Sequence, residues 1–552
     1  MPEDKTHMQG WTRRATLGGI AVAGGLQMSA VSGAAGSADL IAETTGGRLR
    51  GARAGNAIAF KGVRYAVAKR FMPPSRPHPW AGVQDAMSFG ASAVQTNVNP
   101  PPGPPYVILA QLPRPANAPP PVKLPESEDC QFLNIWTSAL KDGGKRPVMV
   151  WLHGGFFYGG TGSTVDGASL AARGDVVVVS LNHRLNAFGF SHLAEIGGAD
   201  FAHSANVGML DIIAALEWIR DNIEAFGGDP ARVMVFGTSG GGMKTSFLMA
   251  SPRARGLFSR AGVQSGPGLR FMERDRAAAV TDRLMHILEL KPRDIGALRA
   301  MPAEKLLAGF HAVSQQMSPE RFIDLPCFAP VIDEALLPRH PFSPDASPLA
   351  CTIPMLIGSN AQEMSFFMGN DPQGFLLDEA GLADRARNLV GALAADLLPL
   401  YAKAYPGTSP SRRYIQLNSD YSVMLPAIAQ AERMAARGGQ AWLYRLDYQS
   451  PALDGTLGAL HTMEGSLLFD TPAAGRALLG DGPAPALLAK RMSAAWVAFA
   501  TNGDPNSAAS GLPHWPTYDD QQRATMLFDV ESRVMDDPAQ AMREALGPAL
   551  KI

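Results

Sequence analysis

The sequence predicts an α/β fold with a large, mostly parallel central sheet that is flanked by helices. Two continuous apolar runs, at residues 147–152 and 176–181, are typical of strands that are buried on both faces. Before a third run at 233–236, residues 206–225 place apolar side chains at helical spacing. The segment 227–230, Gly-Gly-Asp-Pro, ends this helix. Strands that alternate with helices in this way are typical of a parallel, doubly wound sheet.

The remaining expected elements continue the same alternation. Residues 270–325 and 370–435 have mostly helical patterns, and we expect these insertions to form a cap over the carboxyl ends of the strands. A final amphipathic helix is expected at 485–501. Further short strands are expected at 47–51, 57–60, 261–264, 354–357 and 442–446.

The composition is that of a globular enzyme with many loops. The chain has 552 residues, of which 46% are hydrophobic and 18% charged, with 57 glycines and 44 prolines. Its 49 Lys and Arg residues balance 50 Asp and Glu residues, which leaves no basic excess for nucleic acid. The length alone suggests two or more domains. One large α/β domain with insertions fills the same length, and we expect such a domain over residues 39–552.

The first 38 residues are predicted to be an export signal of the twin-arginine type rather than part of the fold. Residues 12–17, Thr-Arg-Arg-Ala-Thr-Leu, resemble the twin-arginine motif; a weakly apolar run follows at 18–28, and small residues at 36–38 offer a cleavage site. The alternatives are a disordered basic start and a true start codon at Met8. We expect the mature protein in the periplasm or outside the cell. No later stretch is long and apolar enough to span a bilayer.

Residues 97–125 are rich in proline and lack periodicity, so we expect a long surface loop there. Loops of this length in compact enzymes often form a lid or rim of a binding site. A solvated insertion without such a role is the alternative.

Cysteine usage argues against a metal site. The chain has three cysteines, so at least one thiol has no intramolecular partner, while Cys327 and Cys351 can pair on sequence grounds. None of the three has the spacing of metal ligands, and we expect neither a metal nor a cofactor.

The most informative motif is G-x-S-x-G at 237–241, Gly-Thr-Ser-Gly-Gly, which directly follows the apolar run at 233–236. A segment compatible with a helix begins at Gly242. A strand, a sharp turn and a helix in this order form the nucleophile elbow of an α/β-hydrolase, in which the turn exposes the serine hydroxyl. Glycines flank the serine because larger side chains would collide in that turn. Ser239 is therefore the candidate nucleophile.

A serine hydroxyl needs a general base, and in this fold the chain order is Ser, then Asp or Glu, then His. Five histidines follow Ser239, and the base must be a late one. His514 lies in a stiff Pro-His-Trp-Pro turn near the C-terminus, whereas His461 lies in a loop shortly after the strand at 442–446. We therefore predict His461 as the base.

The acid of such a triad must orient the imidazole, and it is expected just after a strand. Glu363 follows the strand at 354–357 and a polar loop, while Asp333 follows the apolar run at 329–332. The local pattern is compatible with either carboxylate.

An oxyanion hole needs backbone N–H groups that point at the developing negative charge. Gly240, directly after Ser239, supplies one. Gly154 and Gly155 follow the strand at 147–152, where a glycine-rich loop of this fold supplies the others. The alternative for these two glycines is an ordinary tight turn.

In these segments and several others the chain resembles the type-B carboxylesterases, which include bacterial carboxylesterases and cholinesterases. The resemblance implies the α/β-hydrolase fold with helical cap insertions, a Ser239–Glu363–His461 triad, and a structural pair of Asp229 with Arg184. It covers nearly the whole chain after the signal. The matching segments are 60–66, 127–134, 151–155, 206–211, 226–230, 263–266, 360–363, 458–461 and 502–505.

Four positions depart from the family's pattern. Thr238 stands where the family usually has glutamate; this removes a negative charge beside the serine and argues against a cationic, choline-like substrate. Gly240 replaces the usual alanine but keeps its N–H. Phe156 stands where the oxyanion loop usually has a third small residue. Its backbone N–H is a third candidate donor from this loop. Losing one oxyanion donor costs about 3–4 kcal/mol of transition-state stabilisation. Cys130 matches a family cysteine whose usual upstream partner is absent from this chain.

The predicted function is a serine carboxylesterase that hydrolyses small-molecule esters through an acyl-enzyme, with no nucleic-acid partner and no stable membrane insertion. A hydrolase specialised for amides or thioesters is one alternative, and a non-catalytic binding protein on the same scaffold is another. The predicted oxyanion donors are Gly154, Gly155, Phe156 and Gly240. The predicted pocket residues, each next to a catalytic segment, are Phe157, Tyr158, Thr238, Met243, Phe366 and Met463.

Overall fold

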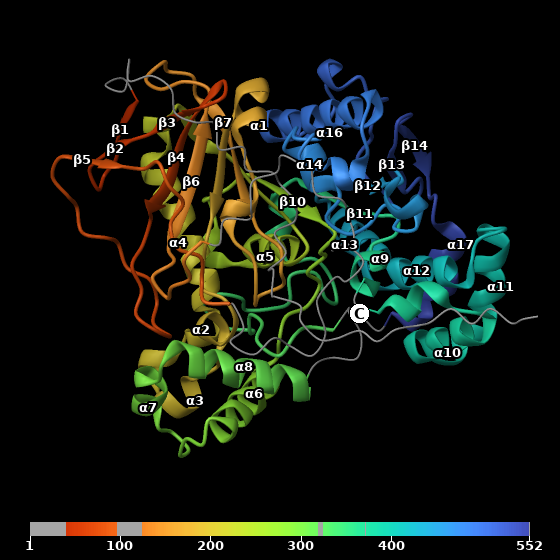
Figure 1. The fold of residues 1–552 in the computed structure, drawn as a ribbon, viewed down its shortest axis with the longest axis horizontal. Helices are drawn as coiled ribbons and strands as arrows, with labels where there is room; N and C mark the ends of the chain where they lie inside the picture. Colours follow the sequence, from red (N-terminus) through yellow and green to blue (C-terminus); the bar gives the residue numbers. More distant parts are fainter. Residues whose placement is uncertain (1–39, 96–123, 318–323, 370, 551–552) are drawn as a thin grey trace, which may run out of the picture.

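The computed structural model describes residues 40–95, 124–317, 324–369 and 371–550 (Figure 1). The predicted export signal at 1–38 lies outside the described residues, as does nearly all of the proline-rich segment at 97–125. Both remain sequence-based predictions.

A mixed sheet of eleven strands crosses the described part of the chain, in the order β14-β13-β12-β11-β10-β9-β7-β8-β6-β4-β3 (Figure 1). Its central part is parallel, as the sequence predicts, and its edges are antiparallel. The seven parallel strands are β7 (Arg146–Leu152), β8 (Val177–Leu181), β9 (Gly228–Thr238), β10 (Arg260–Gln264), β11 (Met355–Asn360), β12 (Ala441–Leu446) and β13 (Ala524–Phe528). The outer strands are β3 (Ala52–Ala54), β4 (Ala57–Arg64), β6 (Phe132–Thr137) and β14 (Arg533–Asp536).

The sequence did not predict β6, β13 or β14, although each of them extends the sheet. A separate small sheet at the N-terminal side contains β1 (Ile41–Glu43), β2 (Arg48–Arg50) and β5 (Val83–Asp85). Of the three missed strands of the large sheet, only β14 is a short, largely exposed edge strand, for which the sequence signal is weak. Strands β6 and β13 are buried inside the sheet and were missed although their residues are mostly apolar.

The central strands are apolar throughout because both faces of the sheet are covered. Alternate side chains of β7 enter different hydrophobic clusters: Val148 and Val150 on one face, Met149 and Trp151 on the other. Helices α4 (Val207–Asn222), α5 (Gly240–Ala250) and α13 (Leu425–Ala435) contribute to the first cluster, and α1 (Ala168–Gly174) and α16 (Pro483–Asn502) to the second. This two-sided packing is the doubly wound arrangement that the alternation of strands and helices predicts.

The two predicted insertions are helical and lie at the carboxyl ends of parallel strands (Figure 1). Helix α8 packs on α2 (Asn186–Phe190), which follows β8, and α12 packs on α9 (Met364–Met368), which follows β11. The first insertion contains α6 (Arg274–Ile287), α7 (Ile295–Ala300) and α8 (Ala303–Met317). The second contains α10 (Glu379–Val390), α11 (Ala394–Ala404), α12 (Pro410–Ser419) and the π-helical segment Asp420–Met424.

Two pairings considered from the sequence do not form. Cys327 and Cys351 are both free thiols. Arg184 does not pair with Asp229; it binds the buried carboxylate of Asp211 with two hydrogen bonds of 2.7 and 2.8 Å. Asp229 contacts Arg232 at 3.0 Å instead. The pair implied by the family resemblance was therefore wrong.

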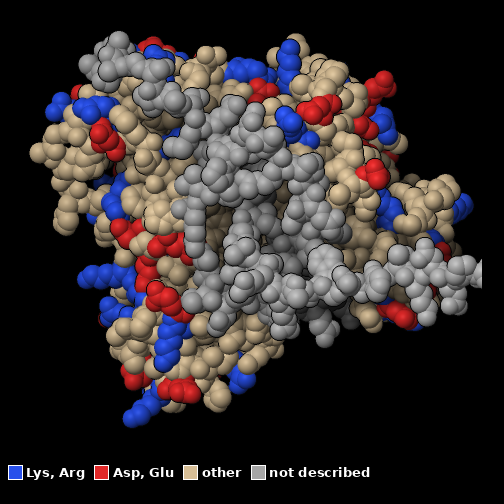
Figure 2. Space-filling model, in the orientation of Figure 1, with Lys and Arg blue, Asp and Glu red and all other residues tan. Residues whose placement is uncertain are grey.

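The surface in Figure 2 intermixes basic and acidic side chains and does not separate them into fields of one sign. This agrees with the even balance of charges in the sequence. Among the described helices, none combines the length and apolar character needed to cross a membrane.

Candidate active site

The serine lies in a strained turn at the middle of the sheet. Gly237, near the end of β9, is paired with Leu152 of β7 and Val263 of β10, and the chain turns two residues later into α5. Ser239 has φ +60° and ψ −124°, a backbone region that non-glycine residues rarely occupy. A Cβ on Gly241 would lie 2.0 Å from the carbonyl oxygen of Leu152, so only glycine allows this close approach. The predicted nucleophile elbow is present.

The predicted base and one of the two candidate acids are in direct contact. His461 Nδ1 lies 2.5 Å from Glu363 Oε2, although the two residues are 98 positions apart. Because a carboxylate can only accept, Nδ1 donates, and this tautomer leaves Nε2 as the atom able to take a proton. Glu363 is fully buried, and its Oε1 accepts a 2.6 Å hydrogen bond from the Asn360 backbone N–H. The imidazole is oriented by a fixed, buried carboxylate.

The competing candidates lie elsewhere. Asp333 contacts His203 Nδ1 at 3.0 Å and accepts hydrogen bonds from the backbone N–H groups of Ala335 and Leu336. His514 is exposed in the loop before β13. Neither residue takes part in the Glu363–His461 contact.

The loop after β7 packs its backbone directly against the elbow. A Cβ on Gly154 would lie 3.4 Å from Ser239 Cβ, so this loop borders the serine. A Cβ on Gly240 would lie 2.3–2.6 Å from the backbone O, Cα and N of Phe156. Phe156 itself has φ +49°. The glycine at 240 therefore allows the backbone of residue 156 to approach the elbow closely.

The predicted oxyanion donors are backbone groups at this junction. Neither Gly154 N–H nor Gly155 N–H donates a hydrogen bond within the described structure. Helix α5 has no capping side chain at its N-terminus, so the N–H of Gly240, its first residue, is not used by a cap. These N–H groups are able to bind an anionic oxygen.

Glu464, which was not predicted from the sequence, places a buried carboxyl group next to Thr238, the residue before the serine. Thr238 Oγ1 donates a 2.9 Å hydrogen bond to Glu464 Oε1, and Asn360 Nδ2 donates one of 2.7 Å to Oε2. Burial, together with the neighbouring Glu363, raises the pKa of the Glu464 carboxyl. Thr238 thus brings no charge of its own, but it binds a buried carboxyl group whose raised pKa disfavours the charged form. The spacing of Glu464, three residues after His461, was the available signal.

The predicted pocket residues occupy two kinds of environment. Tyr158 is 40% exposed; its ring stacks on Phe156 at 5.5 Å and lies 6.3 Å from Phe310 of α8. Phe366 is buried and lies 5.6 Å from the His461 ring. Phe157 is fully buried between Phe190 and Phe271. Met243 and Met463 are also buried in the hydrophobic clusters.

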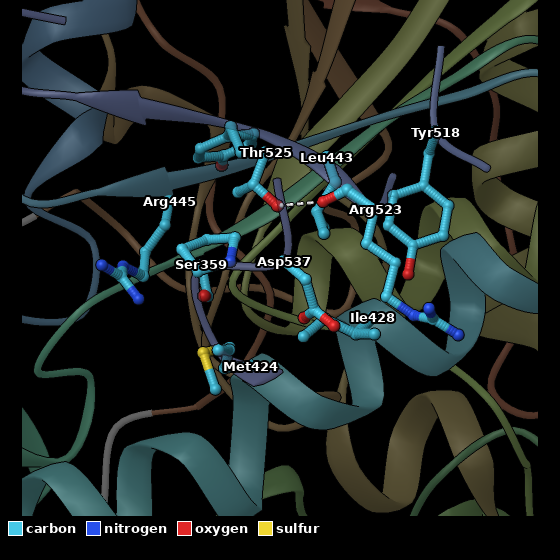
Figure 3. Close-up of a pocket in the computed structure, with 12 residues that line it drawn as sticks. Ser359, Met424, Ile428, Leu443, Arg445, Tyr518, Arg523, Thr525 and Asp537 are labelled. Carbon is cyan, nitrogen blue, oxygen red and sulfur yellow. Dashed lines mark hydrogen bonds between the residues drawn. The ribbon is translucent and has the colours of Figure 1, made fainter. Parts of the chain in front are cut away.

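A small cavity of about 20 Å³ is lined by residues of β11, β12, β13 and α13 and by none of the three predicted triad residues (Figure 3). Ser359 lines it, whereas the next residue, Asn360, binds Glu464, and successive side chains of a strand point to opposite faces. Its volume suits a single water molecule. Among the described residues, no group of three or more His, Cys, Asp or Glu side chains is arranged to hold a metal ion.

Comparison with known proteins agrees with this geometry. The model of the Carboxylesterase family matches residues 38–546. The chain belongs to the carboxylesterase family. Membership of this family makes the protein a carboxylic ester hydrolase with the α/β-hydrolase fold.

Relatives in this family are similar along almost their whole length. The para-nitrobenzyl esterase of Bacillus subtilis (strain 168) is 32% identical, over 92% of this chain and 99% of the relative. The phenmedipham hydrolase of Pseudarthrobacter oxydans is 35% identical, over 92% and 97%. The crystal structure of a Geobacillus stearothermophilus carboxylesterase at pH 6.2 superposes with a TM-score of 0.77 at 35% identity, covering 92% of this chain and 99% of that one.

Proposed function

We propose that this carboxylesterase hydrolyses esters through an acyl-enzyme on Ser239, with His461 as general base and acid and Glu363 as its orienting carboxylate. The observation that carries the proposal is the buried contact of 2.5 Å between His461 Nδ1 and Glu363 Oε2. This contact fixes the tautomer that a proton acceptor at Nε2 requires, and it stabilises the imidazolium formed during the reaction.

In the first half of the reaction, Ser239 Oγ attacks the ester carbonyl carbon while His461 Nε2 takes the hydroxyl proton. The carbonyl oxygen becomes an oxyanion, which the N–H groups of Gly154, Gly155 and Gly240 stabilise, with Phe156 as a further candidate donor. The C–O bond to the alcohol then breaks, and His461 gives its proton to the leaving alcohol.

In the second half, water replaces the alcohol. His461 Nε2 takes a proton from the water as the oxygen attacks the acyl carbon, and the same oxyanion forms again. The bond to Ser239 breaks, the serine recovers its proton from His461, and the carboxylic acid leaves. No electrons are exchanged with a cofactor in either half, since each step is a proton transfer coupled to acyl transfer.

We propose small esters with an apolar acyl or aryl group as the substrate class. Aromatic side chains near the candidate triad, among them Tyr158 and Phe366, support this choice. The names of two relatives, para-nitrobenzyl esterase and phenmedipham hydrolase, point to aryl-containing substrates for those proteins.

The test is hydrolysis of p-nitrophenyl acetate, butyrate and octanoate by the mature protein beside Ser239→Ala. Turnover by the wild type that falls at least about 10⁴-fold in the variant supports the proposal, since removal of the nucleophile leaves only the oxyanion hole. Equal rates in the two proteins would overturn it. The three chain lengths also measure the size of the acyl pocket.

We also propose that the mature enzyme is exported. The support is the pair Arg13-Arg14 ahead of a weakly apolar run. Replacing both arginines by lysine should retain the enzyme in the cytoplasm, measured by cell fractionation of esterase activity. Unchanged distribution would contradict export by this route.

A further inference from the structure

We propose that Lys244 is a positioning residue for the oxyanion hole: it holds the His153–Gly154 peptide group, at which the loop with the predicted donors begins. The inference rests on the proposed function and adds residues that the triad and its donors do not include.

Lys244 is a buried lysine on α5, five residues after Ser239. Its side chain is fully buried, and its Nζ donates a 3.0 Å hydrogen bond to the carbonyl oxygen of His153. Within the described residues it is not paired with a carboxylate. Burial lowers its pKa to about 7. Both the ammonium and the neutral amine carry N–H donors, so the bond to His153 does not depend on one charge state.

The bonded carbonyl belongs to the same peptide group as the Gly154 N–H. Because a trans peptide is planar, its C=O and N–H point in opposite directions. Fixing the oxygen of His153 on α5 therefore fixes the plane of this peptide at the start of the loop that borders Ser239. A donor on the oxygen also polarises the peptide and strengthens its N–H as a donor.

His153 continues the same arrangement by one residue. Its Nδ1 lies 2.8 Å from the carbonyl oxygen of Gly154, which belongs to the same peptide group as the Gly155 N–H. Since a carbonyl accepts, Nδ1 carries the hydrogen. Two successive peptide groups of the oxyanion loop are thus held at their oxygens by buried side chains, and both present their N–H groups as predicted donors.

His183 holds the ring of His153 in place. The two imidazoles stack with centroids 4.9 Å apart and planes 8° apart, and His183 Nδ1 is bonded to the oxygen of Arg184 at 2.8 Å. Burial, followed by the charge of Lys244, lowers the pKa of both imidazoles, so they are neutral. Lys244, His153 and His183, which we call the loop brace, come from three different elements and meet behind the loop.

A buried polar group that is held only for stability is often replaced by an apolar one with little loss. The loop brace differs because the bonds of Lys244 and His153 end on peptide oxygens of the oxyanion loop. Its loss should therefore weaken binding of the transition state and leave binding of the substrate nearly unchanged.

The experiment compares wild type, Lys244→Met and the control Lys61→Met. Lys61 serves as the control because it is a partly buried lysine of β4, outside the predicted site, whose Nζ lies 4.7 Å from the centre of the Phe89 ring. For each protein, kcat and KM are measured with p-nitrophenyl butyrate, together with the affinity for a trifluoromethyl ketone. That inhibitor forms a tetrahedral oxyanion adduct with the serine.

Lys244→Met is expected to lower kcat about tenfold or more, less than the loss of a whole donor, with KM within about twofold of wild type. The affinity for the trifluoromethyl ketone should fall in parallel, and Lys61→Met should change none of these values. Unchanged kcat in a folded Lys244→Met would overturn the inference, as would a rise in KM alone. If this variant does not fold, His153→Leu is measured for the same pattern. An inactive wild type would instead refute the proposed function.

Discussion

On the serine half of the candidate site, around Ser239 and the loop after β7, the proposed oxyanion donors are backbone N–H groups. On the histidine half, the proposed base is the side chain of His461, which contacts the buried Glu363. The supports differ in the same way. On the serine half, Lys244 and His153 hold peptide oxygens of the loop, and His183 stacks on the His153 ring. The histidine half is held by Glu464, Asn360 and the polar residues of α12.

This difference follows from the kind of group that each half has to orient: a peptide N–H on the serine half and an imidazole on the histidine half. A backbone donor is aimed by the plane of its peptide, so the serine half needs close approach between backbones, with glycine at the contact. An imidazole is aimed by its own hydrogen bond, so the histidine half needs a buried acceptor such as Glu363. Mutations should therefore act through sterics on one half and through hydrogen bonding on the other.

The largest effect is expected from Glu363→Gln on the histidine half. The amide oxygen can keep the bond from the Asn360 N–H, but the amide nitrogen cannot accept from His461 Nδ1. The imidazole then favours the wrong tautomer, and kcat should fall about 10⁴-fold with KM little changed. Steady-state kinetics measure this. The control Glu432→Gln changes a carboxylate that contacts Arg523 and should leave kcat unchanged; a loss below tenfold in Glu363→Gln would remove Glu363 from the triad.

On the serine half, Gly240→Ala should lower kcat about 100-fold, comparable with the loss of one oxyanion donor. The added Cβ would meet the Phe156 backbone at 2.3–2.6 Å and push the loop away. Gly296→Ala is the control, because a Cβ at this exposed helical position meets nothing closer than 3.7 Å. Wild-type kcat in Gly240→Ala would show that the loop tolerates displacement.

The contributions of the two halves to the free energy of unfolding should also change with pH in opposite directions. Burial raises the pKa of Asp420, behind the histidine half, from 3.8 to about 6. The native state then binds more protons than the unfolded state between these values, so stability falls as pH rises through this window. The variant Asp420→Asn should not show this fall. The difference in free energy of unfolding between variant and wild type should shift by on the order of 2 kcal/mol in favour of the variant from pH 4 to pH 7. Denaturant unfolding at several pH values measures it; a parallel pH profile in both proteins would contradict it.

For Lys244, behind the serine half, the native pKa of about 7 lies below the usual 10.5. The unfolded state binds more protons between these values, so stability rises with pH from about 7 to 10.5. Lys244→Met should abolish this rise in the same unfolding series. If Asp420→Asn and Lys244→Met change the dependence of stability on pH in the same direction, the two buried groups do not have opposite effects on stability.

The smallest effect is expected at the contact between the halves. Thr238→Val removes the hydroxyl that donates to Glu464 and leaves a buried carboxylate with one hydrogen bond fewer. The free energy of unfolding should fall by about 1–2 kcal/mol. The control Thr352→Val removes an exposed hydroxyl bonded to the Leu349 oxygen and should cost less than about 0.5 kcal/mol. Equal losses would mean that the contact contributes nothing specific.

Local sequence determined the elements that depend on neighbours along the chain. The strand, turn and helix around Ser239 were predictable because apolar runs specify buried strands and flanking glycines specify a sharp turn. Eight expected strands and the final helix agree with the structure for the same reason. The family resemblance added the choice of Glu363, which the local pattern left open against Asp333.

Only the tertiary structure decided which distant side chains meet. Glu363 lies against His461 while Asp333 lies against His203, and Arg184 binds Asp211 in place of Asp229. Glu464 meets Thr238 across 226 positions, and Lys244 reaches the His153 oxygen across 91. Such contacts depend on strand order and register, which bring the ends of β7, β9, β11 and β12 together. A one-dimensional pattern indicates where a strand lies but not which strands flank it. The sequence therefore supplied the candidate reacting groups, and the tertiary structure decided which partners they contact.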